Sequence, residues 1–492
     1  MSLDSRRRAE ALESRTNARV FSMTARQFDL PPVIIGAGPA GLAAAKAFVE
    51  AGIRPIILEE TNNPGGQGTR RLHPSIESYG HTIFGRKYYE KALRRQNEED
   101  TILNHCDYRP GTMAWAIYDN VVSTVSQRHQ QEIPYQQLLI AIGATDRILA
   151  VEGWQLGGVY SLGGAQVALK THASSIGKKI VFAGSSPLLY LAAAQYVRLG
   201  FRDVTILDTT TQHAKYKAAF HMARYSLKTL FEGVSLINEL KSCGVKIFNG
   251  VRLTRFEGNG HVEAVVYADQ NGTTQRLECD AIGFGFGLKP ETQLAELAGA
   301  KIEFDPHFRQ WLPLISNDGQ ARDDLWLAGD CVVIGGAEAA DASGRLAALT
   351  MLKQRGKPTD QREFQSLAKK VSRLRNFQRA MASAFRWPHE NAALLSDQTY
   401  VCRCERVTVG EIRKTVEADI AHTEVNRIKA ITRCGMGRCQ GRYCNQTLQE
   451  LAVCSSGKSP EATGRLRAQA PFRPMPVGVS ESFLNKQEQE NG

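Results

Sequence analysis

A chain of 492 residues with 42% hydrophobic content can bury large cores and should divide into roughly three domains. Its 61 basic and 50 acidic residues are interspersed and no nucleic-acid signature occurs, so the net charge of +11 favours an acidic partner or substrate over nucleic acid. No apolar run reaches the length of a membrane span, which leaves at most a peripheral membrane association.

The first 27 residues are polar, bear several arginines and lack the hydrophobic segment of a secretory signal. A transit peptide would be poor in acids, whereas this stretch contains Asp4, Glu10 and Glu13. We therefore expect a disordered lead-in and a cytoplasmic protein.

A strand, a glycine turn and a helix open the folded part of the chain. The apolar run that ends at Ile35 is followed by the GxGxxG motif GAGPAG, and then by an alanine-rich helix over residues 42–50. The first glycine permits a tight turn, the second lets a pyrophosphate approach the backbone, and the third lets the helix pack on the strand. The motif predicts nucleotide binding by Gly36, Gly38, Pro39, Ala40 and Gly41, with the helix N–H groups facing the phosphates.

The next strand, residues 55–58, ends in Glu59, whose carboxylate can accept hydrogen bonds from ribose hydroxyls. Strand, helix and acid together predict an adenine dinucleotide, although GxGxxG alone often arises by chance. The sequence GGQ at Gly65, Gly66 and Gln67 resembles the loop that passes beside the flavin in flavoproteins with two dinucleotide domains. This resemblance implies FAD rather than NAD.

Residues 138–145, LLIAIGAT, resemble the second signature of these flavoproteins, which closes the first part of the FAD domain. The resemblance implies that Gly143 and Ala144 form a turn beside the cofactor. Ile142 replaces the usual threonine, so the hydroxyl contact of that threonine is lost. An ordinary buried strand is the alternative.

Residues 179–208 repeat the order strand, turn, helix and strand, which predicts a second Rossmann unit in an inserted domain. Ser186 and Leu189 occupy the places of the second and third glycines. Because a serine side chain faces the pyrophosphate position and a leucine disturbs close helix packing, we expect this unit to have lost its nicotinamide nucleotide. Residues 1–400 also lack the redox CxxC motif of disulfide reductases, and Cys106, Cys243, Cys279 and Cys331 are single.

The chain then returns to the FAD domain through residues 281–290, which resemble the usual crossover. LWLAGDC, residues 325–331, resembles the third flavin signature, in which Gly329 and Asp330 contact the ribityl chain of FAD. The helix that follows would direct its positive end at the flavin. Residues 364–385 form a basic amphipathic pattern, which predicts a connector helix packed on the core; a partner-binding groove is the alternative.

Five of the ten cysteines fall between residues 402 and 444, which indicates a metal or cluster site in a reducing compartment. The CxC spacing of Cys402 and Cys404, the interval of 34 residues before Cys439, and the four residues before Cys444 are poor zinc spacing. The segment resembles the helical [2Fe–2S] domain of the bacterioferritin-associated ferredoxin type, which implies these four thiolates as ligands. Cys434 competes for a place, but Cys444 begins a helical run and is better placed. Zinc and a cluster-free thiol set are the alternatives.

The whole arrangement resembles the A subunits of bacterial opine oxidases, over about residues 32–454 and again at RPMPV, residues 473–477. Related chains belong to hydrogen cyanide synthase, D-hydroxyproline dehydrogenase and heterotetrameric sarcosine oxidase. The resemblance implies an FAD and [2Fe–2S] electron-transfer subunit of an oxidoreductase that acts on CH–NH donors such as octopine or nopaline.

In that family the amine is oxidised on a separate catalytic flavoprotein (beta) subunit. The resemblance allows for an FMN at the interface between the subunits, a small third subunit and a downstream electron acceptor. The sequence names no catalytic residue. A self-contained NAD(P)H-dependent reductase and a zinc-stabilised binding module are the alternative functions.

The predicted fold is α/β: a two-dinucleotide-binding-domain flavoprotein with a Rossmann-like FAD domain, an inserted NAD(P)-like domain and a small helical C-terminal [2Fe–2S] domain. The predicted boundaries are a lead-in at 1–27, FAD domain at 28–150 and 286–355, insertion at 151–285, connector at 356–395, cluster domain at 396–456 and extended tail at 457–492.

Overall fold

The computed structural model describes residues 28–67, 70–418, 420, 422–476 and 480–481. The predicted lead-in, residues 1–27, and the last part of the predicted tail lie outside the described residues.

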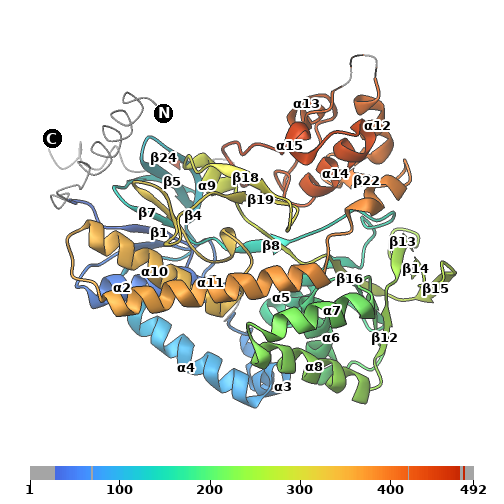
Figure 1. Cartoon of the computed structure of the whole chain (residues 1–492), viewed down its shortest axis with the longest axis horizontal. Helices are drawn as coiled ribbons and strands as arrows, with labels where there is room; N and C mark the ends of the chain where they lie inside the picture. Colours follow the sequence, from blue (N-terminus) through green and yellow to red (C-terminus); the bar gives the residue numbers. More distant parts are fainter. Residues whose placement is uncertain (1–27, 68–69, 419, 421, 477–479, 482–492) are drawn as a thin grey trace, which may run out of the picture.

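A six-stranded sheet forms the centre of the FAD-type domain (Figure 1). Its strand order is β20-β21-β7-β1-β2-β3, and all neighbours are parallel except β20 and β21. The strands are β1 (Val33–Ile35), β2 (Ile56–Leu58), β3 (Asp107–Arg109), β7 (Leu138–Ile140), β20 (Gln320–Arg322) and β21 (Leu325–Leu327). Because the chain leaves the sheet after β7 and returns in β21 beside it, the insertion grows from one place on the sheet.

Helices α2 (Pro39–Glu50) and α10 (Ala337–Gln354) pack closely on each other over this sheet. A Cβ atom on Gly344 would lie 2.0 Å from the carbonyl oxygen of Ala40, so only glycine permits this crossing. Helix α2 begins at Pro39, three residues before the predicted start, because proline is well suited to the first position of a helix. The described part of this domain also contains α3 (Gly80–Phe84), α4 (Arg86–Leu103) and α9 (Gln293–Leu297).

Short strands complete the FAD-type domain. The sheet β24-β6-β5-β4 contains β4 (Met113–Tyr118), β5 (Val121–Ser126), β6 (His129–Pro134) and β24 (Ser480–Glu481), and β18 (Ile302–Asp305) pairs with β19 (Gln310–Pro313). The strand and glycine turn predicted for residues 138–145 are present as β7 followed by a turn at Gly143, whose φ is +72°, and the chain then continues in β8 (Ala144–Asp146). Strand β8 pairs with β17 (Leu288–Pro290), so the outgoing and returning chains run side by side.

The inserted domain contains a parallel five-stranded sheet in the order β12-β11-β10-β16-β9. Its elements are β9 (Val159–Ser161), α5 (Leu162–His172), β10 (Ile180–Gly184), α6 (Pro187–Arg198), β11 (Val204–Asp208), α7 (Gln212–Ala223), α8 (Leu227–Ser242), β12 (Lys246–Asn249) and β16 (Ala281–Gly285). A three-stranded sheet joins β13 (Arg252–Glu257), β14 (Ala264–Ala268) and β15 (Thr274–Glu278). The second Rossmann unit expected from the sequence is present.

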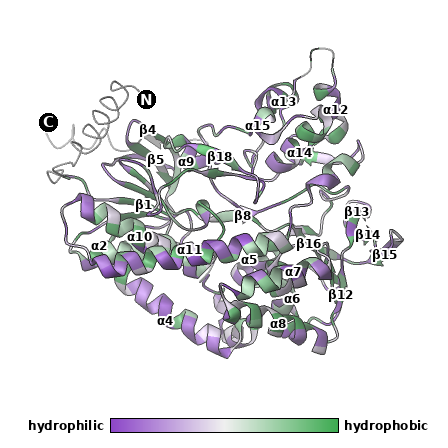
Figure 2. Ribbon diagram, in the orientation of Figure 1, coloured by the Kyte–Doolittle hydropathy of each residue, from purple (hydrophilic) through white to green (hydrophobic). Residues whose placement is uncertain are grey.

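Helix α11 (Gln361–Ala384) connects the flavin-type part to the cluster domain and packs against α10 and α7. Val371 contacts the α10 side chains Ala342 and Leu346, whereas Phe377 and Ala384 pack with α7 residues. Its apolar face is therefore used inside the molecule, while the outer faces of α4 and α11 are hydrophilic (Figure 2).

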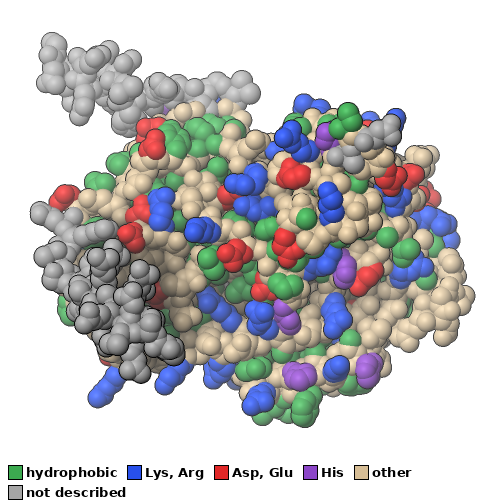
Figure 3. All heavy atoms as spheres, turned by 45° about the horizontal axis from the view of Figure 1, so that its top comes forward, with side chains coloured by type: hydrophobic (Ala, Val, Ile, Leu, Met, Phe, Trp, Pro, Cys, Tyr) green, Lys and Arg blue, Asp and Glu red, His purple; other side chains and the backbone are tan. Residues whose placement is uncertain are grey.

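The C-terminal domain lies above β8, at the upper right of Figure 1. It contains β22 (Tyr400–Cys402), β23 (Val407–Thr408), α12 (Val409–Val416), α13 (Val425–Thr432), α14 (Asn445–Ser456) and α15 (Pro460–Thr463). Basic and acidic side chains are interspersed over the face in Figure 3. Among the described helices, none combines the length and apolar character that crossing a membrane requires.

Candidate functional site

The glycines in the turn after β1 are of two kinds, which differ in the space around them. A Cβ atom on Gly41 would lie 1.9 Å from the oxygen of Gly36, and one on Gly36 would lie 2.5 Å from the oxygen of Ala141. These two positions therefore require glycine for the protein's own packing. Gly38 differs, since its Cβ would meet only Gly66 Cα, at 3.9 Å. Gly38 thus lines open space, as a pyrophosphate cradle requires.

The GGQ loop folds back over this turn. The N–H of Gly65 donates to the carbonyl of Ala37 at 2.8 Å, and this bond brings Gly66 against Gly38. Gln67 is exposed. The loop therefore lies beside the start of α2, where a phosphate would meet free N–H groups.

Glu59 lies at the carboxyl end of β2 and is buried. Its Oε2 accepts from the N–H of Ala37 at 2.8 Å, and its Oε1 accepts from the N–H and hydroxyl of Thr61 at 2.9 and 2.7 Å. Because each carboxylate oxygen can accept two hydrogen bonds, Oε2 retains capacity for a ribose hydroxyl.

The second and third signatures follow β7 and β21, which neighbour each other in the sheet, with β7 also beside β1. The carbonyl of Gly143 accepts from the N–H of Glu291 at 3.1 Å, and Ala144 pairs with Pro290. The N–H of Gly329 donates to the Ser343 hydroxyl at 3.0 Å. All three signatures therefore meet at the carboxyl ends of adjacent strands, where open α/β sheets bind ligands.

The carboxylate of Asp330 is held by the start of α10. Its Oδ1 accepts from the N–H groups of Gly335 and Gly336 at 2.8 and 3.1 Å, bonds that do not use Oδ2. Burial raises the pKa of Asp330, and the two N–H groups oppose this shift. The donor and acceptor pattern from Gly36 to Asp330 fits an FAD.

The inserted domain uses its equivalent acid differently. Asp208, at the end of β11, is fully buried, and its Oδ2 accepts from the Tyr190 hydroxyl and lies against Lys215 Nζ, both at 2.5 Å. Its Oδ1 accepts from the N–H of Thr210 at 2.7 Å. Thus the carboxylate at the ribose-recognising position is already engaged by this chain's own side chains. Ser186 caps α6, and Leu189 is buried in the core of the domain.

The structure brings five cysteines together in the C-terminal domain. The sulfurs of Cys402, Cys434 and Cys444 lie within 4.8 Å of one another and are buried. Hydrogen bonds also join Cys439 to Cys444 and to Cys404. The four predicted ligands therefore lie in one group that also includes Cys434, and the choice among the five thiols stays a prediction.

Backbone N–H groups surround these sulfurs, as expected for a site of anionic thiolates. Hydrogen bonds from Cys434, Cys444 and then the Gly435 and Glu405 backbones lower the pKa of Cys402 to about 2, against burial. A bond from Cys444 leads the causes that lower the pKa of Cys439 to about 5. A Cβ atom on Gly437 would lie 2.3 Å from the Cβ of Cys404, so this glycine lets the two cysteine loops approach.

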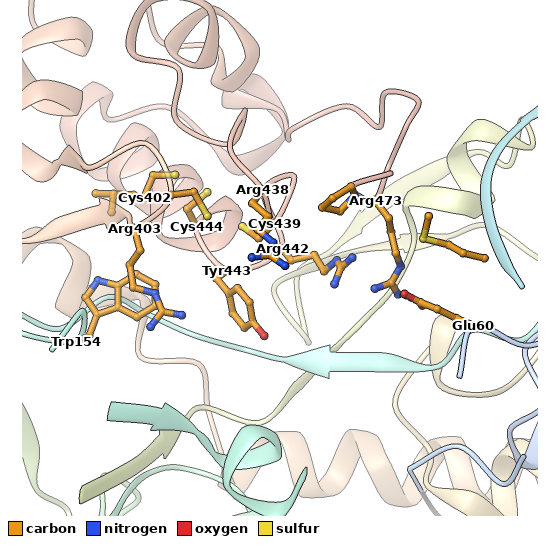
Figure 4. A pocket seen from close by; sticks show the side chains of 14 residues that line it. Glu60, Trp154, Cys402, Arg403, Arg438, Cys439, Arg442, Tyr443, Cys444 and Arg473 are labelled. Carbon is orange, nitrogen blue, oxygen red and sulfur yellow. The ribbon is translucent and has the colours of Figure 1, made fainter. Parts of the chain in front are cut away.

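A cavity of about 420 Å³ lies beside the thiols and extends to Glu60, the residue that follows Glu59 in the sequence (Figure 4). Arg403 lies over Trp154, with 4.2 Å between Cζ and the ring centroid. Arg442 Nε lies 3.7 Å from the buried carboxylate of Glu291. The cavity is also lined by Arg438, Arg473, Tyr443, Cys404 and Cys439. No local motif predicts this arginine-lined space, because its residues come from separate segments of the chain.

A second feature missed from the sequence is the joint that holds the cluster domain in place. Arg147, just after β8, donates to Gln446 Oε1 at 2.7 Å and to the carbonyls of Phe308 and Arg309 at 3.1 and 2.6 Å. Glu450 accepts from Arg309 Nη2 at 2.7 Å and from Trp387 Nε1 at 2.9 Å. These bonds tie the chain entering the inserted domain, the β18–β19 turn, the connector and helix α14 into one unit.

Comparisons with known proteins agree with this architecture. The family "Pyridine nucleotide-disulphide oxidoreductase" matches residues 31–347, and "BFD-like [2Fe-2S] binding domain" matches residues 400–452. One of the opine oxidase A subunits, that of Agrobacterium tumefaciens (strain Ach5), is 31% identical over 458 residues, which cover 90% of each chain. The chain belongs to the family of opine oxidase A subunits.

The chain is also similar to a second named subunit and, in fold, to a solved structure. Hydrogen cyanide synthase subunit HcnB of Pseudomonas aeruginosa is 29% identical, over 92% of this chain and 99% of its own. The solved structure of L-proline dehydrogenase from P. horikoshii superposes with a TM-score of 0.64 at 20% identity, over 92% of this chain and 79% of that chain, and shows the fold alone. The predicted fold class and the cofactors FAD and [2Fe–2S] are thus confirmed for this opine oxidase A-type chain.

Proposed function

We propose that the chain is the FAD and [2Fe–2S] electron-transfer subunit of a multisubunit oxidase whose substrate is a secondary amine such as octopine or nopaline. The amine would be oxidised on a partner flavoprotein subunit. The names of the relatives support a subunit role, because the similar chains of opine oxidase and hydrogen cyanide synthase are each named as a subunit.

The proposal rests on one observation: the same chain contains an FAD cradle and a cluster of cysteine thiols. Buried hydrogen bonds hold the two domains that carry them together. FAD supplies two-electron storage and a [2Fe–2S] cluster supplies one-electron steps, so a chain with both can divide an electron pair. Gly38 and the start of α2 would hold the pyrophosphate, Glu59 the ribose and Asp330 the ribityl chain. Cys402, Cys404, Cys439 and Cys444 would hold the cluster, with Cys434 as the competing ligand.

The alternative of a self-contained NAD(P)H-dependent reductase is less well supported. The acid that would bind the nicotinamide nucleotide's ribose is engaged by Tyr190 and Lys215. Ser186 and Leu189 replace the glycines that let a pyrophosphate approach. We therefore expect NADH and NADPH to leave the flavin oxidised when each is mixed with the isolated chain.

The decisive experiment mixes the purified, FAD- and cluster-loaded chain with octopine or nopaline in a stopped-flow spectrophotometer. We expect no flavin bleaching by either amine, whereas dithionite should reduce both flavin and cluster. Addition of the partner subunit should then give turnover. Rapid bleaching of the isolated chain by an opine would place the amine site here and refute the proposal.

The alternative functions are those of a subunit of hydrogen cyanide synthase or of D-hydroxyproline dehydrogenase. Purification of the chain together with its partner subunit, followed by assay with each substrate, distinguishes these functions. The cytoplasmic location, the FMN at the interface, the small third subunit and the domain boundaries stay predictions.

A further inference from the structure

Cys404 is the outermost thiol of the cluster site. Cys402, Cys434 and Cys444 are buried and Cys439 is half-buried, whereas Cys404 is exposed. A cluster held by this group would come closest to solvent on the side of Cys404. Because electron transfer slows steeply with distance, this side is the favourable place for electrons to leave the chain.

The loops that carry the thiols are rich in arginine. The two loops that carry the thiols, residues 402–407 and 433–444, contain five arginines and one glutamate. Four of these arginines are exposed: Arg403, Arg406, Arg433 and Arg438. We call these four residues the arginine rim. Arg403 and Arg438 line the cavity together with Cys404.

Among the residues that the structure describes, Arg433 is the one member of the rim with an acidic partner, Glu405, so three of the four charges are unpaired. Glu405 Oε2 accepts from Arg433 Nε at 2.9 Å, but the Glu405 side chain is 22% exposed and that of Arg433 is 65% exposed. Across the cavity, Glu60 lies 3.2 Å from Arg473, so this carboxylate already has its own cation. Arg403 is held in place by the rings of Trp154 and Tyr443. The surface facing an approaching molecule is thus positive and partly rigid.

We infer that the arginine rim is the docking surface of an acidic one-electron carrier protein. The inference rests on the proposed function only for the direction of electron flow. In each encounter a reduced cluster held by these thiols would give one electron to the carrier's redox centre, with no bond made or broken. Complementary charge accelerates such encounters by steering the partner, an effect that salt weakens.

The test uses the full, cofactor-loaded chain, reduced with dithionite that is then removed. The reduced chain is mixed with an acidic plastocyanin or with a basic cytochrome c, at low and high salt. We expect the second-order rate constant with plastocyanin to fall by about tenfold with salt, and that with cytochrome c not to fall. Reduction of plastocyanin is followed through the loss of its blue copper absorbance.

Because the whole chain is basic, a matched variant must locate the effect. Arg406→Gln with Arg438→Gln should lower the plastocyanin rate at low salt by about fivefold. The double variant Arg94→Gln with Arg362→Gln removes the same charge from exposed positions on α4 and α11 and should leave the rate unchanged. Visible spectra must show that both variants keep flavin and cluster.

An equal effect of both double variants, or a rate that does not respond to salt, would overturn the inference. If the rim variant slowed the reduction of the small anion ferricyanide but not that of plastocyanin, the rim would be a site for small anions. That result would likewise contradict the inference. These readouts need no amine and no partner subunit. The rim can therefore be confirmed even if the proposed opine chemistry fails, and refuted even if that chemistry holds.

Discussion

The guanidinium of Arg147 lies 4.1 Å from the centroid of the Trp387 ring, and both residues are buried. Arg147 leaves the FAD-type domain just before the insertion, whereas Trp387 follows the connector helix. Their contact, with Glu450 as acceptor for the indole, fixes the cluster domain against the flavin domain. Burial lowers the pKa of Arg147 to about 9, and Glu450 opposes this shift, so the side chain stays charged at neutral pH.

Arg147→Met should loosen the cluster domain. The methionine keeps contact with Trp387 but leaves the carbonyls of Phe308 and Arg309 without their donor. Breaking a buried polar unit of this kind costs about 3 kcal/mol or more of unfolding free energy. Denaturant unfolding followed by cluster absorbance should show the loss, and limited proteolysis should cut near the connector. The exposed variant Arg276→Met should behave like the unmodified chain; if it is equally sensitive, the joint is not the cause.

Gly38→Val should abolish FAD binding without unfolding the chain. The added side chain enters the space of the pyrophosphate but meets only Gly66 Cα within 4 Å of its Cβ. The flavin absorbance of the purified variant and its circular dichroism measure these two effects. In contrast, Gly41→Val should misfold, because its Cβ would lie 1.9 Å from the Gly36 oxygen. A folded Gly38→Val protein with one FAD per chain would refute the cradle.

Serine substitutions should identify the cluster ligands. We expect Cys402→Ser, Cys404→Ser, Cys439→Ser and Cys444→Ser each to lose the visible cluster absorbance, and Cys434→Ser to keep it. Iron and acid-labile sulfide analysis checks the result and excludes zinc. Cys434 lies within 4.8 Å of Cys402 and Cys444, so it is close enough to compete for the cluster. Loss of the absorbance in Cys434→Ser together with its retention in Cys444→Ser would show that the ligand set includes Cys434.

Lys170 should make stability depend on pH. It is 6% exposed, and burial, aided by Arg70, lowers its pKa to about 8 from 10.5. Between these two values the unfolded chain binds more protons than the folded one, so the unfolding free energy rises as pH rises through this window. Below the pKa of Lys170 in the folded chain, the side chain is protonated in both states, so the free-energy cost of burying its charge no longer changes with pH.

Lys170→Met should therefore raise the unfolding free energy at neutral pH by about 3 kcal/mol and remove this rise. Urea unfolding at neutral and alkaline pH measures both effects. Lys46→Met, on an exposed position of α2, serves as the control and should keep the pH dependence of the unmodified chain. An unchanged dependence in Lys170→Met would show that Lys170 is not the group responsible.

Local sequence determined the fold class, because each flavin signature combines a strand, a glycine turn and a polar residue within a few positions. Gly36, Gly38, Gly41 and Glu59 could be assigned roles from spacing alone, and the structure places them at one sheet edge. The cysteine spacing likewise indicated a cluster domain. Such patterns are readable because the motif's residues are neighbours along the chain.

Only the tertiary structure decided which distant side chains meet. Tyr190 and Lys215 engage Asp208 through the folding of α6 and α7 against β11, and neither residue belongs to a motif. Arg147 reaches Gln446 across 299 positions, and Cys434 joins the other thiols because the loop after α13 turns inward. Contacts of this kind depend on how whole elements pack. Hydrophobic burial drives that packing, and no local sequence pattern shows which polar residues it brings together.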